Sequence, residues 1–271
     1  MYLNFFEKTH IQDPVERRGV DGNFWVWQIP DYSRDYMVVA DVARGDGNDF
    51  SAFHVFDIEE ATQVAEFKAQ VQTKDYGNLL FAVATEYNDA LLVVENANVG
   101  WAAIQVAIDR DYKNLYYTYK HEGVTDFDIG INKGYDLKDK SQMVPGFTTS
   151  SRTRPLLISK LDIYFREKEC IVRSKRLIDE LFVFIWNGAK AEAQQGYNDA
   201  LVMAYAIALF VRDTALKLRQ HGLDLNKAAL SSLGSGKSTG IYTQTDNHVP
   251  GAWDMNIGRE GPNEDLTWLI K

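Results

Sequence analysis

The sequence predicts an α/β fold in which a mixed β-sheet is flanked by helices on both faces. Three short runs at 36–42, 51–57 and 63–72 are apolar or alternate, and they lie close enough together to form an antiparallel meander. Later apolar runs alternate with stretches of helical periodicity, the order typical of strands added in parallel through helical crossovers. Apolar residues make up 45% of the 271 residues, which is enough to bury a core of this kind.

The predicted meander begins with the most buried strand. Residues 36–42 (YMVVADV) are almost continuously apolar, as in a central strand covered on both faces. A loop rich in turn-forming residues follows at 44–49 (RGDGND). Residues 51–57 and 63–72 then alternate as strands with two different faces do. Residues 1–35, which are polar with embedded aromatic side chains, are expected to be a linker segment leading into the domain.

Helices and strands alternate in the rest of the predicted domain. Periodicity predicts helices at 75–88, 99–110, 154–168 and 197–218, a helical or mixed element at 175–184, and strands at 91–95, 115–119 and 171–172. Residues 123–150 are rich in Gly, Asp, Lys and Ser, and are expected to form an inserted loop or hairpin. The domain would span 36–220, and the Gly-, Asn- and Ser-rich residues 221–271 would form a C-terminal tail.

Charge, cysteine content and hydropathy exclude several classes of protein. The formal net charge of −9 disfavours a protein that coats nucleic acid by charge alone. The single cysteine, Cys170, excludes an intramolecular disulfide and a multi-cysteine zinc site. The longest apolar run, 200–211, is shorter than the ~20 residues that span a bilayer, and the first residues lack the pattern of a signal peptide. We therefore expect a soluble, intracellular protein.

One segment of this acidic chain is basic. Between Arg152 and Lys190 there are nine Lys and Arg residues against five Asp and Glu, a local charge of +4. A solvated helix face and a phosphate-contacting surface both fit this charge. If the protein binds a polyanion, Lys160, Arg152 and Arg154 are the candidate contacts.

Three carboxylates occupy positions where an unpaired charge would be costly to bury. Asp41 lies within the first apolar strand, Glu95 ends a later one, and Asp199 begins the apolar helix; Asp49 stands just before the adjoining strand. Oxygen ligands without Cys or His partners are those that Mg²⁺ and Mn²⁺ prefer. Two such ions could activate a water and stabilise the leaving 3′ oxygen of a phosphodiester, with Asp41 bridging them.

Each of these acids also has an ordinary structural explanation. Asp41 could pair with a helix N-terminus, and Glu95 could form a salt bridge at a strand end. Asp199 could cap its helix, and Asp49 could form an Asx turn. The metal hypothesis therefore depends on the four side chains converging at one edge of the sheet.

Two segments imitate ligand-binding motifs. Residues 233–239 (LGSGKST) resemble a phosphate-binding loop, but Ser231 stands in place of the first glycine and no buried strand precedes the segment. Residues 126–130 (DFDIG) begin like a calcium loop, but the glycine is misplaced and no Glu follows at the twelfth position. We assign no ligand to either segment, and an ATPase is the weakest interpretation of the chain.

Three segments of the chain set the four acids in distinct motifs. Residues 41–52 (DVARGDGNDFSA) are an acid and a Gly-rich turn followed by a second acid, residues 92–98 (LVVENAN) include an acid followed by Asn, and residues 196–204 (GYNDALVMA) place Asn-Asp before an apolar helix. In this order they resemble the first, second and third catalytic motifs of the nuclease domain of the large terminase subunit of tailed bacteriophages. Residues 145–149 (PGFTT), followed by Arg154-Pro155, resemble a segment that often precedes the later helix, and the whole resemblance covers residues 20–215.

The resemblance implies an RNase H-like fold and a metal-dependent endonuclease that cleaves concatemeric double-stranded DNA during genome packaging. By motif position, Asp41, Glu95 and Asp199 would be the catalytic metal ligands, with Asp49 accessory, and would hold Mg²⁺ or Mn²⁺ in a two-metal site. Ala200 stands where many relatives have a second acid.

The resemblance also implies partners and a location. These are double-stranded DNA, the ATPase motor, the portal and the small terminase subunit, in the cytoplasm of the infected bacterial host. Residues 1–35 do not resemble the motor, so we expect the nuclease part alone, as a fragment or a separately encoded piece.

Two other functions remain open on the sequence. An RNase H-like junction resolvase would prefer branched to linear DNA. A non-catalytic docking module would bind the packaging machine through the tail and its residues Trp253 and Trp268. Such a module has no need of three acids beside an apolar core, which favours the nuclease.

Overall fold

The computed structural model describes residues 2–45, 47, 49–97, 99–119, 143–188, 190–213 and 216. They all belong to the larger of two compact units, residues 1–220. The two motif-like segments at 126–130 and 233–239, most of the expected insertion, and the expected tail with Trp253 and Trp268 lie outside the described residues.

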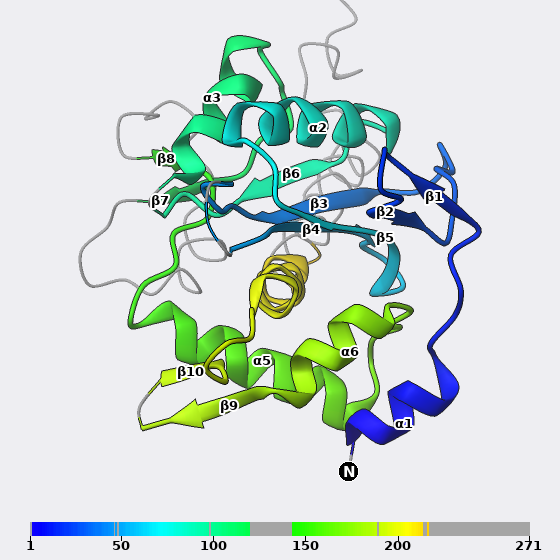
Figure 1. Ribbon diagram of the computed structural model, residues 1–271. Helices are drawn as coiled ribbons and strands as arrows, with labels where there is room; N and C mark the ends of the chain where they lie inside the picture. Colours follow the sequence, from blue (N-terminus) through cyan, green and yellow to red (C-terminus); the bar gives the residue numbers. More distant parts are fainter. Residues whose placement is uncertain are drawn as a thin grey trace, which may run out of the picture. The chain divides into compact units, whose positions relative to one another are not determined.

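A six-stranded mixed sheet with the strand order β1-β2-β5-β4-β3-β6 forms the centre of the fold (Figure 1). β3 (Tyr36–Asp41), β4 (Ser51–Asp57) and β5 (Thr62–Ala69) are antiparallel neighbours, and β6 (Leu91–Val94) runs parallel to β3. The predicted antiparallel meander followed by a parallel strand is therefore confirmed.

The two faces of the sheet belong to two separate apolar clusters. On β3, Val38 and Ala40 pack into one cluster, while Met37 and Val39 pack into the other, because successive side chains of a strand point to opposite faces. This double burial explains why residues 36–40 are apolar without interruption.

Helices cover both faces of the sheet (Figure 1). α2 (Thr73–Glu86) and α3 (Gly100–Asp109) lie on one face. On the other face, helical residues 200–213 lie against the sheet, and α5 (Thr153–Glu167), α6 (Lys175–Phe182) and α1 (Tyr2–Thr9) lie beyond them. The helix at 200–213 is buried all round over residues 200–211, as its apolar sequence predicts. In the part of the chain described, no helix is both long enough and apolar enough to cross a membrane.

The first 35 residues contribute more than the expected linker segment. They form α1 and two strands, β1 (Glu16–Arg18) and β2 (Phe24–Val26), and β2 pairs with β5 in the main sheet. Phe24 and Val26 are buried in the sheet face. Strands of three residues are too short to show the alternation of apolar and polar residues that predicts a strand. Only their pairing in the structure shows that residues 1–35 contribute strands to the sheet.

Two small two-stranded sheets complete the described fold. β7 (Tyr117–Tyr119) pairs with β8 (Met143–Pro145), and β9 (Phe184–Asn187) pairs with β10 (Lys190–Ala193). The predicted strand at 171–172 is reduced to one bridge between Ile171 and Thr62. The element predicted at 175–184 is helical as α6 up to residue 182, and its last residue begins β9.

Candidate active site

Asp41 and Glu95 lie side by side where two parallel strands end. Ala40 of β3 is opposite Val94 of β6, and the next backbone N–H, that of Glu95, donates to the Ala40 carbonyl at 2.9 Å. Both carboxylates are partly buried. The carboxyl edge of the β3–β6 pair thus brings two of the predicted site residues together, because adjacent parallel strands end at the same edge.

The electrostatics of Asp41 link all four predicted acids. The pKa of Asp41 is raised well above its ordinary value, first by burial and then by the charge of Glu95 and a hydrogen bond with it. The charges of Asp199 and Asp49 raise this pKa further. Glu95, Asp199 and Asp49 therefore each repel the charged form of Asp41, and this repulsion favours its protonated form.

Asp199 faces an arginine as well as the other acids. It immediately precedes the helix at 200–213, and its Oδ2 accepts a hydrogen bond from Arg154 Nη2 at 2.8 Å. The Arg154 Nε donates to the Ala191 carbonyl at 3.0 Å, which holds the guanidinium between α5 and β10. No three Asp, Glu, His or Cys side chains among the described residues are grouped closely enough to surround a metal ion.

Asp49 is the most exposed of the four acids. It lies in the loop between β3 and β4, and its Oδ1 accepts from the N–H of the next residue, Phe50, at 3.0 Å. This hydrogen bond gives Asp49 a local structural role that requires no metal. Its effect on the pKa of Asp41 shows that its charge also reaches the site.

Residues that the sequence analysis did not place at the site shape the end of β6. A Cβ on Gly100 would lie 1.8 Å from the Glu95 carbonyl oxygen, so only glycine fits there. Gly146 has a φ of +84°, and a Cβ there would lie 2.5 Å from the Val94 carbonyl oxygen. The Asn96 side chain donates to the Pro145 carbonyl and to Thr148 Oγ1, each at 3.0 Å. The motif-like segments at 92–98 and 145–149 are thus two halves of one local structure.

The three candidate DNA-contacting residues differ in their surroundings. Arg154 is beside Asp199, as described above. Lys160 lies farther along α5, pairs with Asp213 at 2.5 Å and contacts the ring of Tyr164. Arg152 is exposed just before α5 begins. The structure therefore brings only Arg154 into contact with one of the predicted acids.

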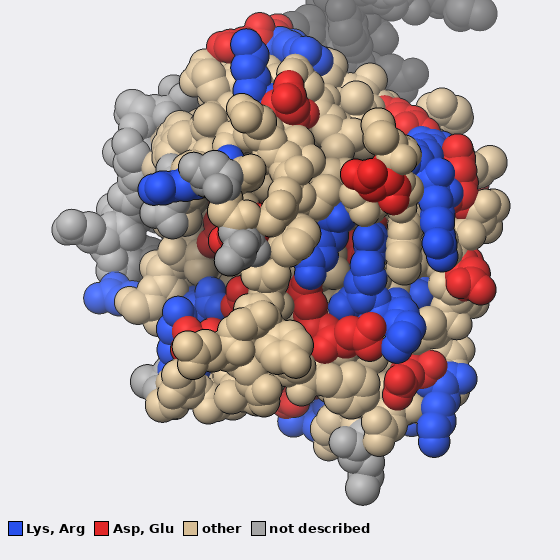
Figure 2. All heavy atoms as spheres, viewed as in Figure 1, with Lys and Arg blue, Asp and Glu red and all other residues tan. Residues whose placement is uncertain are grey.

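The basic segment as a whole is largely paired with acids. Six of its nine Lys and Arg residues form ion pairs: Arg154, Lys160, Arg166, Lys175, Arg176 and Lys190. Figure 2 shows Lys and Arg side chains next to Asp and Glu side chains across the middle of the face viewed. Most of the positive charge of the basic segment is therefore paired with acidic side chains.

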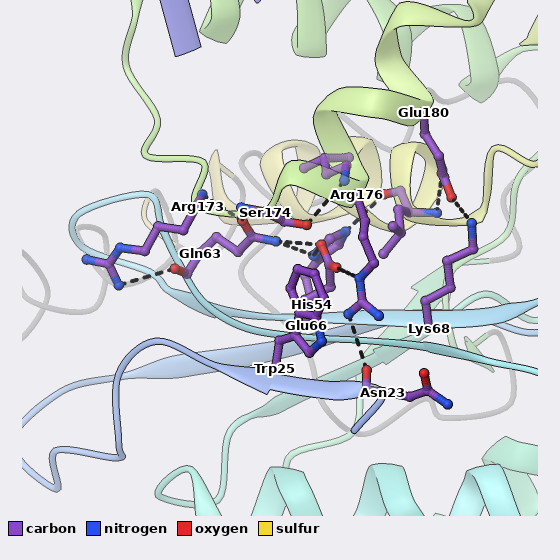
Figure 3. Close-up of polar contacts among 12 residues, drawn as sticks. Asn23, Trp25, His54, Gln63, Glu66, Lys68, Arg173, Ser174, Arg176 and Glu180 are labelled. Carbon is purple, nitrogen blue, oxygen red and sulfur yellow. Dashed lines mark hydrogen bonds and ion pairs between the residues drawn. The ribbon is translucent and has the colours of Figure 1, made fainter. Parts of the chain in front are cut away.

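A second polar cluster, absent from the sequence analysis, is buried between the sheet and α6 (Figure 3). Its members on the sheet are His54, Gln63 and Glu66, all with no exposed surface, and its members on α6 include Arg176 and Glu180. In the sequence, the available signal was Glu180 itself, a charged residue on the apolar face of α6 beside Leu177 and Leu181.

No protein-family model matches this sequence. Among solved structures, the chain is similar to the large terminase nuclease from thermophilic phage G20c with bound cobalt, at 21% identity and a TM-score of 0.55, covering 77% of this chain and 95% of that one. The same nuclease with bound magnesium matches at 21% identity and a TM-score of 0.50, covering 77% and 94%. The large terminase nuclease domain of Thermus phage P74-26 matches at 20% identity and a TM-score of 0.50, covering 76% and 91%. The predicted RNase H-like fold is therefore confirmed, and the chain has the fold of large terminase nuclease domains.

Proposed function

We propose that this chain is a metal-dependent endonuclease that cleaves concatemeric double-stranded viral DNA during genome packaging. The observation that carries the proposal is the meeting of Asp41 and Glu95 at the carboxyl edge of β3 and β6, within electrostatic reach of Asp199 and Asp49. The fold shared with terminase nucleases and the order of the three motifs support it.

The donor set fits a hard divalent cation. All four side chains offer carboxylate oxygens, the ligands that Mg²⁺ and Mn²⁺ prefer. A bound cation would offset the repulsion that raises the pKa of Asp41. Asp41 and Glu95 would hold the ion, with Asp199 and Asp49 completing a two-metal site. Bound metal would supply the activated water and the stabilisation of charge on the phosphate. The solved neighbours with cobalt and magnesium are in keeping with such a site.

Arg154 has two roles in this proposal. In the structure its guanidinium pairs with Asp199. If Asp199 held a cation, the guanidinium would be available to a DNA phosphate, and its bond to the Ala191 carbonyl would keep it beside the site. Arg152, exposed at the start of α5, would contact the DNA backbone nearby.

We extend the proposal to partners on the same basis. The chain would act with the ATPase motor, the portal and the small terminase subunit in the cytoplasm of the infected bacterium. The three motifs and the terminase nuclease fold support this assignment.

A plasmid-cleavage assay tests the proposed activity. Wild type, Asp41→Asn and Glu95→Gln would each be incubated with Mg²⁺, Mn²⁺ or EDTA, with Asp13→Asn as a control for the loss of an exposed acid outside the site. We expect nicking and linearisation that require metal, are unchanged in Asp13→Asn, and fall at least about a hundredfold in the two site variants. Cleavage that persists in Asp41→Asn would contradict the proposal, and a strong preference for branched DNA would indicate a resolvase-type nuclease instead.

A further inference from the structure

Asp199 does not cap the helix that it precedes. The helix begins at residue 200, and the Met203 N–H donates to the Asp199 carbonyl at 2.8 Å, so Asp199 occupies the N-cap position. An Asp at this position ordinarily turns its carboxylate back to accept from the second or third N–H of the helix. Here the carboxylate accepts from Arg154 instead.

Another element caps this helix. Glu180 of α6 accepts through Oε2 from the backbone N–H groups of Leu201, at 2.9 Å, and Val202, at 3.3 Å. These are the second and third residues of the helix, the same two donors that an N-cap carboxylate would bind. Figure 3 shows the carboxylate of Glu180 reaching toward the Lys68 side chain.

The capping carboxylate is held in place by a cation. Lys68 of β5 contacts Glu180 Oε1 at 2.5 Å, while the other oxygen of Glu180 faces the positive end of the helix dipole. Glu180 is only 7% exposed. A buried carboxylate with both oxygens bound is a fixed group, because leaving either partner would expose an unpaired charge to an apolar environment.

The sheet holds the same turn of the helix through a second contact. His54 Nε2 lies 3.0 Å from the Leu201 carbonyl, and Gln63 Nε2 lies 2.9 Å from His54 Nδ1. Because a carbonyl can only accept, the His54 proton is on Nε2 and the ring donates to Leu201. Glu180 of α6 and His54 of β4 therefore bind the N–H and the carbonyl of Leu201, two positions after Asp199.

We propose that Glu180 is a positioning residue for Asp199. By capping the helix from α6, Glu180 keeps the Asp199 carboxylate off the helix N–H groups. The carboxylate pairs with Arg154 in the structure and would be available to a cation held by Asp41 and Glu95. This inference rests on the proposed function of Asp199 as a metal ligand. Glu180 itself contacts neither metal nor DNA in this scheme.

Replacing Glu180 with alanine leaves the helix N–H groups open, and the Asp199 carboxylate then turns back to cap its own helix. We expect the Mn²⁺ affinity of Glu180→Ala, measured by electron paramagnetic resonance of free Mn²⁺, to fall about tenfold, with helix content by circular dichroism unchanged. Glu180→Gln keeps one acceptor oxygen and should lose less affinity. Glu169→Ala, which removes an exposed glutamate on the segment between α5 and α6, is the matched control and should not change.

A double-mutant cycle separates positioning from a general structural role. In an Asp199→Asn background, adding Glu180→Ala should cause no further loss of Mn²⁺ affinity, because the ligand that Glu180 positions is already gone. An additive loss, or unchanged affinity in Glu180→Ala alone, would overturn the inference. If Glu180→Ala does not fold, Glu180→Gln takes its place in the cycle, with the same sign and a smaller effect.

The same cycle shows which proposal has failed. If Asp199→Asn alone leaves both Mn²⁺ binding and cleavage unchanged, the assignment of Asp199 as a ligand is wrong, and with it the proposed function of this residue. If Asp199→Asn reduces both but Glu180→Ala reduces neither, the proposed function stands and the positioning inference is wrong.

Discussion

The carboxylates at the β3–β6 edge and those buried beneath the sheet are surrounded in opposite ways. Glu66 has no exposed surface, and it is bound by Arg176 at 2.8 Å and by Gln63 at 3.0 Å. Asp41 is less buried, yet it faces three other acids. The first arrangement satisfies its charge within the protein, whereas the second leaves negative charge that a cation from solution can offset. The comparison separates a cluster whose charges are paired within the fold from an edge where Asp41 faces other acids, which supports the proposed cation site.

The largest expected effect on stability comes from removing the Arg176 guanidinium that pairs with Glu66. Arg176→Met would leave the fully buried Glu66 carboxylate without its cationic partner, so the free energy of unfolding should fall by about 3–5 kcal/mol. Denaturant unfolding monitored by fluorescence measures this change. Combining Arg176→Met with Glu66→Gln should recover part of the loss; a double variant less stable than Arg176→Met would contradict the pairing as the cause.

A smaller effect is expected from crowding the acidic edge. The added methyl group of Gly100→Ala would collide with the Glu95 carbonyl, so the backbone must shift, at a cost of about 1–3 kcal/mol in unfolding free energy. The shift also displaces the Glu95 carboxylate, so metal-dependent cleavage should fall. Gly47→Ala is the matched control for stability, because a Cβ there meets nothing within 4 Å. Equal stability of the two variants would show that the end of β6 is more adaptable than we infer.

The raised pKa of Asp41 makes the stability contributed by the acidic edge depend on pH. Because folding raises this pKa, the folded state holds the proton more tightly than the unfolded state. The resulting stability is fully present below the ordinary pKa of an aspartate and is lost as the pH rises through the raised pKa. In EDTA, the melting temperature of wild type should therefore fall relative to that of Asp41→Asn as the pH increases, and Mn²⁺ should restore it at neutral pH. Parallel pH profiles for the two proteins would contradict the repulsion.

The smallest expected effect is at an ion pair that water reaches. Lys175 is the neighbour of Arg176 on α6, but its pair with Asp179 is more than half exposed. Lys175→Met should leave the unfolding midpoint without a resolvable change, because exposed pairs contribute little and are screened by salt. It is thus the matched control for Arg176→Met, and a comparable loss in both would remove the distinction between buried and exposed pairs.

The sequence predicts the central strands and the convergence of Asp41 and Glu95 because both follow from local patterns. An uninterrupted apolar run specifies a strand buried on both faces, and an acid at its end then lies at the sheet edge. β2 could not be predicted, since it pairs with β5, about 40 residues away, and β1 joins the sheet only by pairing with β2. Similarly, Glu180 meets Lys68 across 112 positions, and no local period encodes that contact.

Asp199 shows the same limit at the site itself. The sequence predicts that Asp199 precedes an apolar helix, and it also allows the alternative that Asp199 caps that helix. Its pairing with Arg154 and the replacement cap from Glu180 depend on where α5 and α6 pack. The sequence thus predicted where Asp199 lies relative to the helix. The partner that its carboxylate contacts could be found only from the tertiary structure.

The central claim is that the carboxylates at the β3–β6 edge hold a divalent cation. Anomalous X-ray scattering from crystals soaked in Mn²⁺ tests it directly, with crystals of Asp41→Asn as the control. We predict an anomalous peak between Asp41 and Glu95, with the Asp199 carboxylate turned from Arg154 toward the ion, and no peak there in the variant. A peak at another place, or an empty edge with Asp199 still paired to Arg154 at saturating Mn²⁺, would contradict the account.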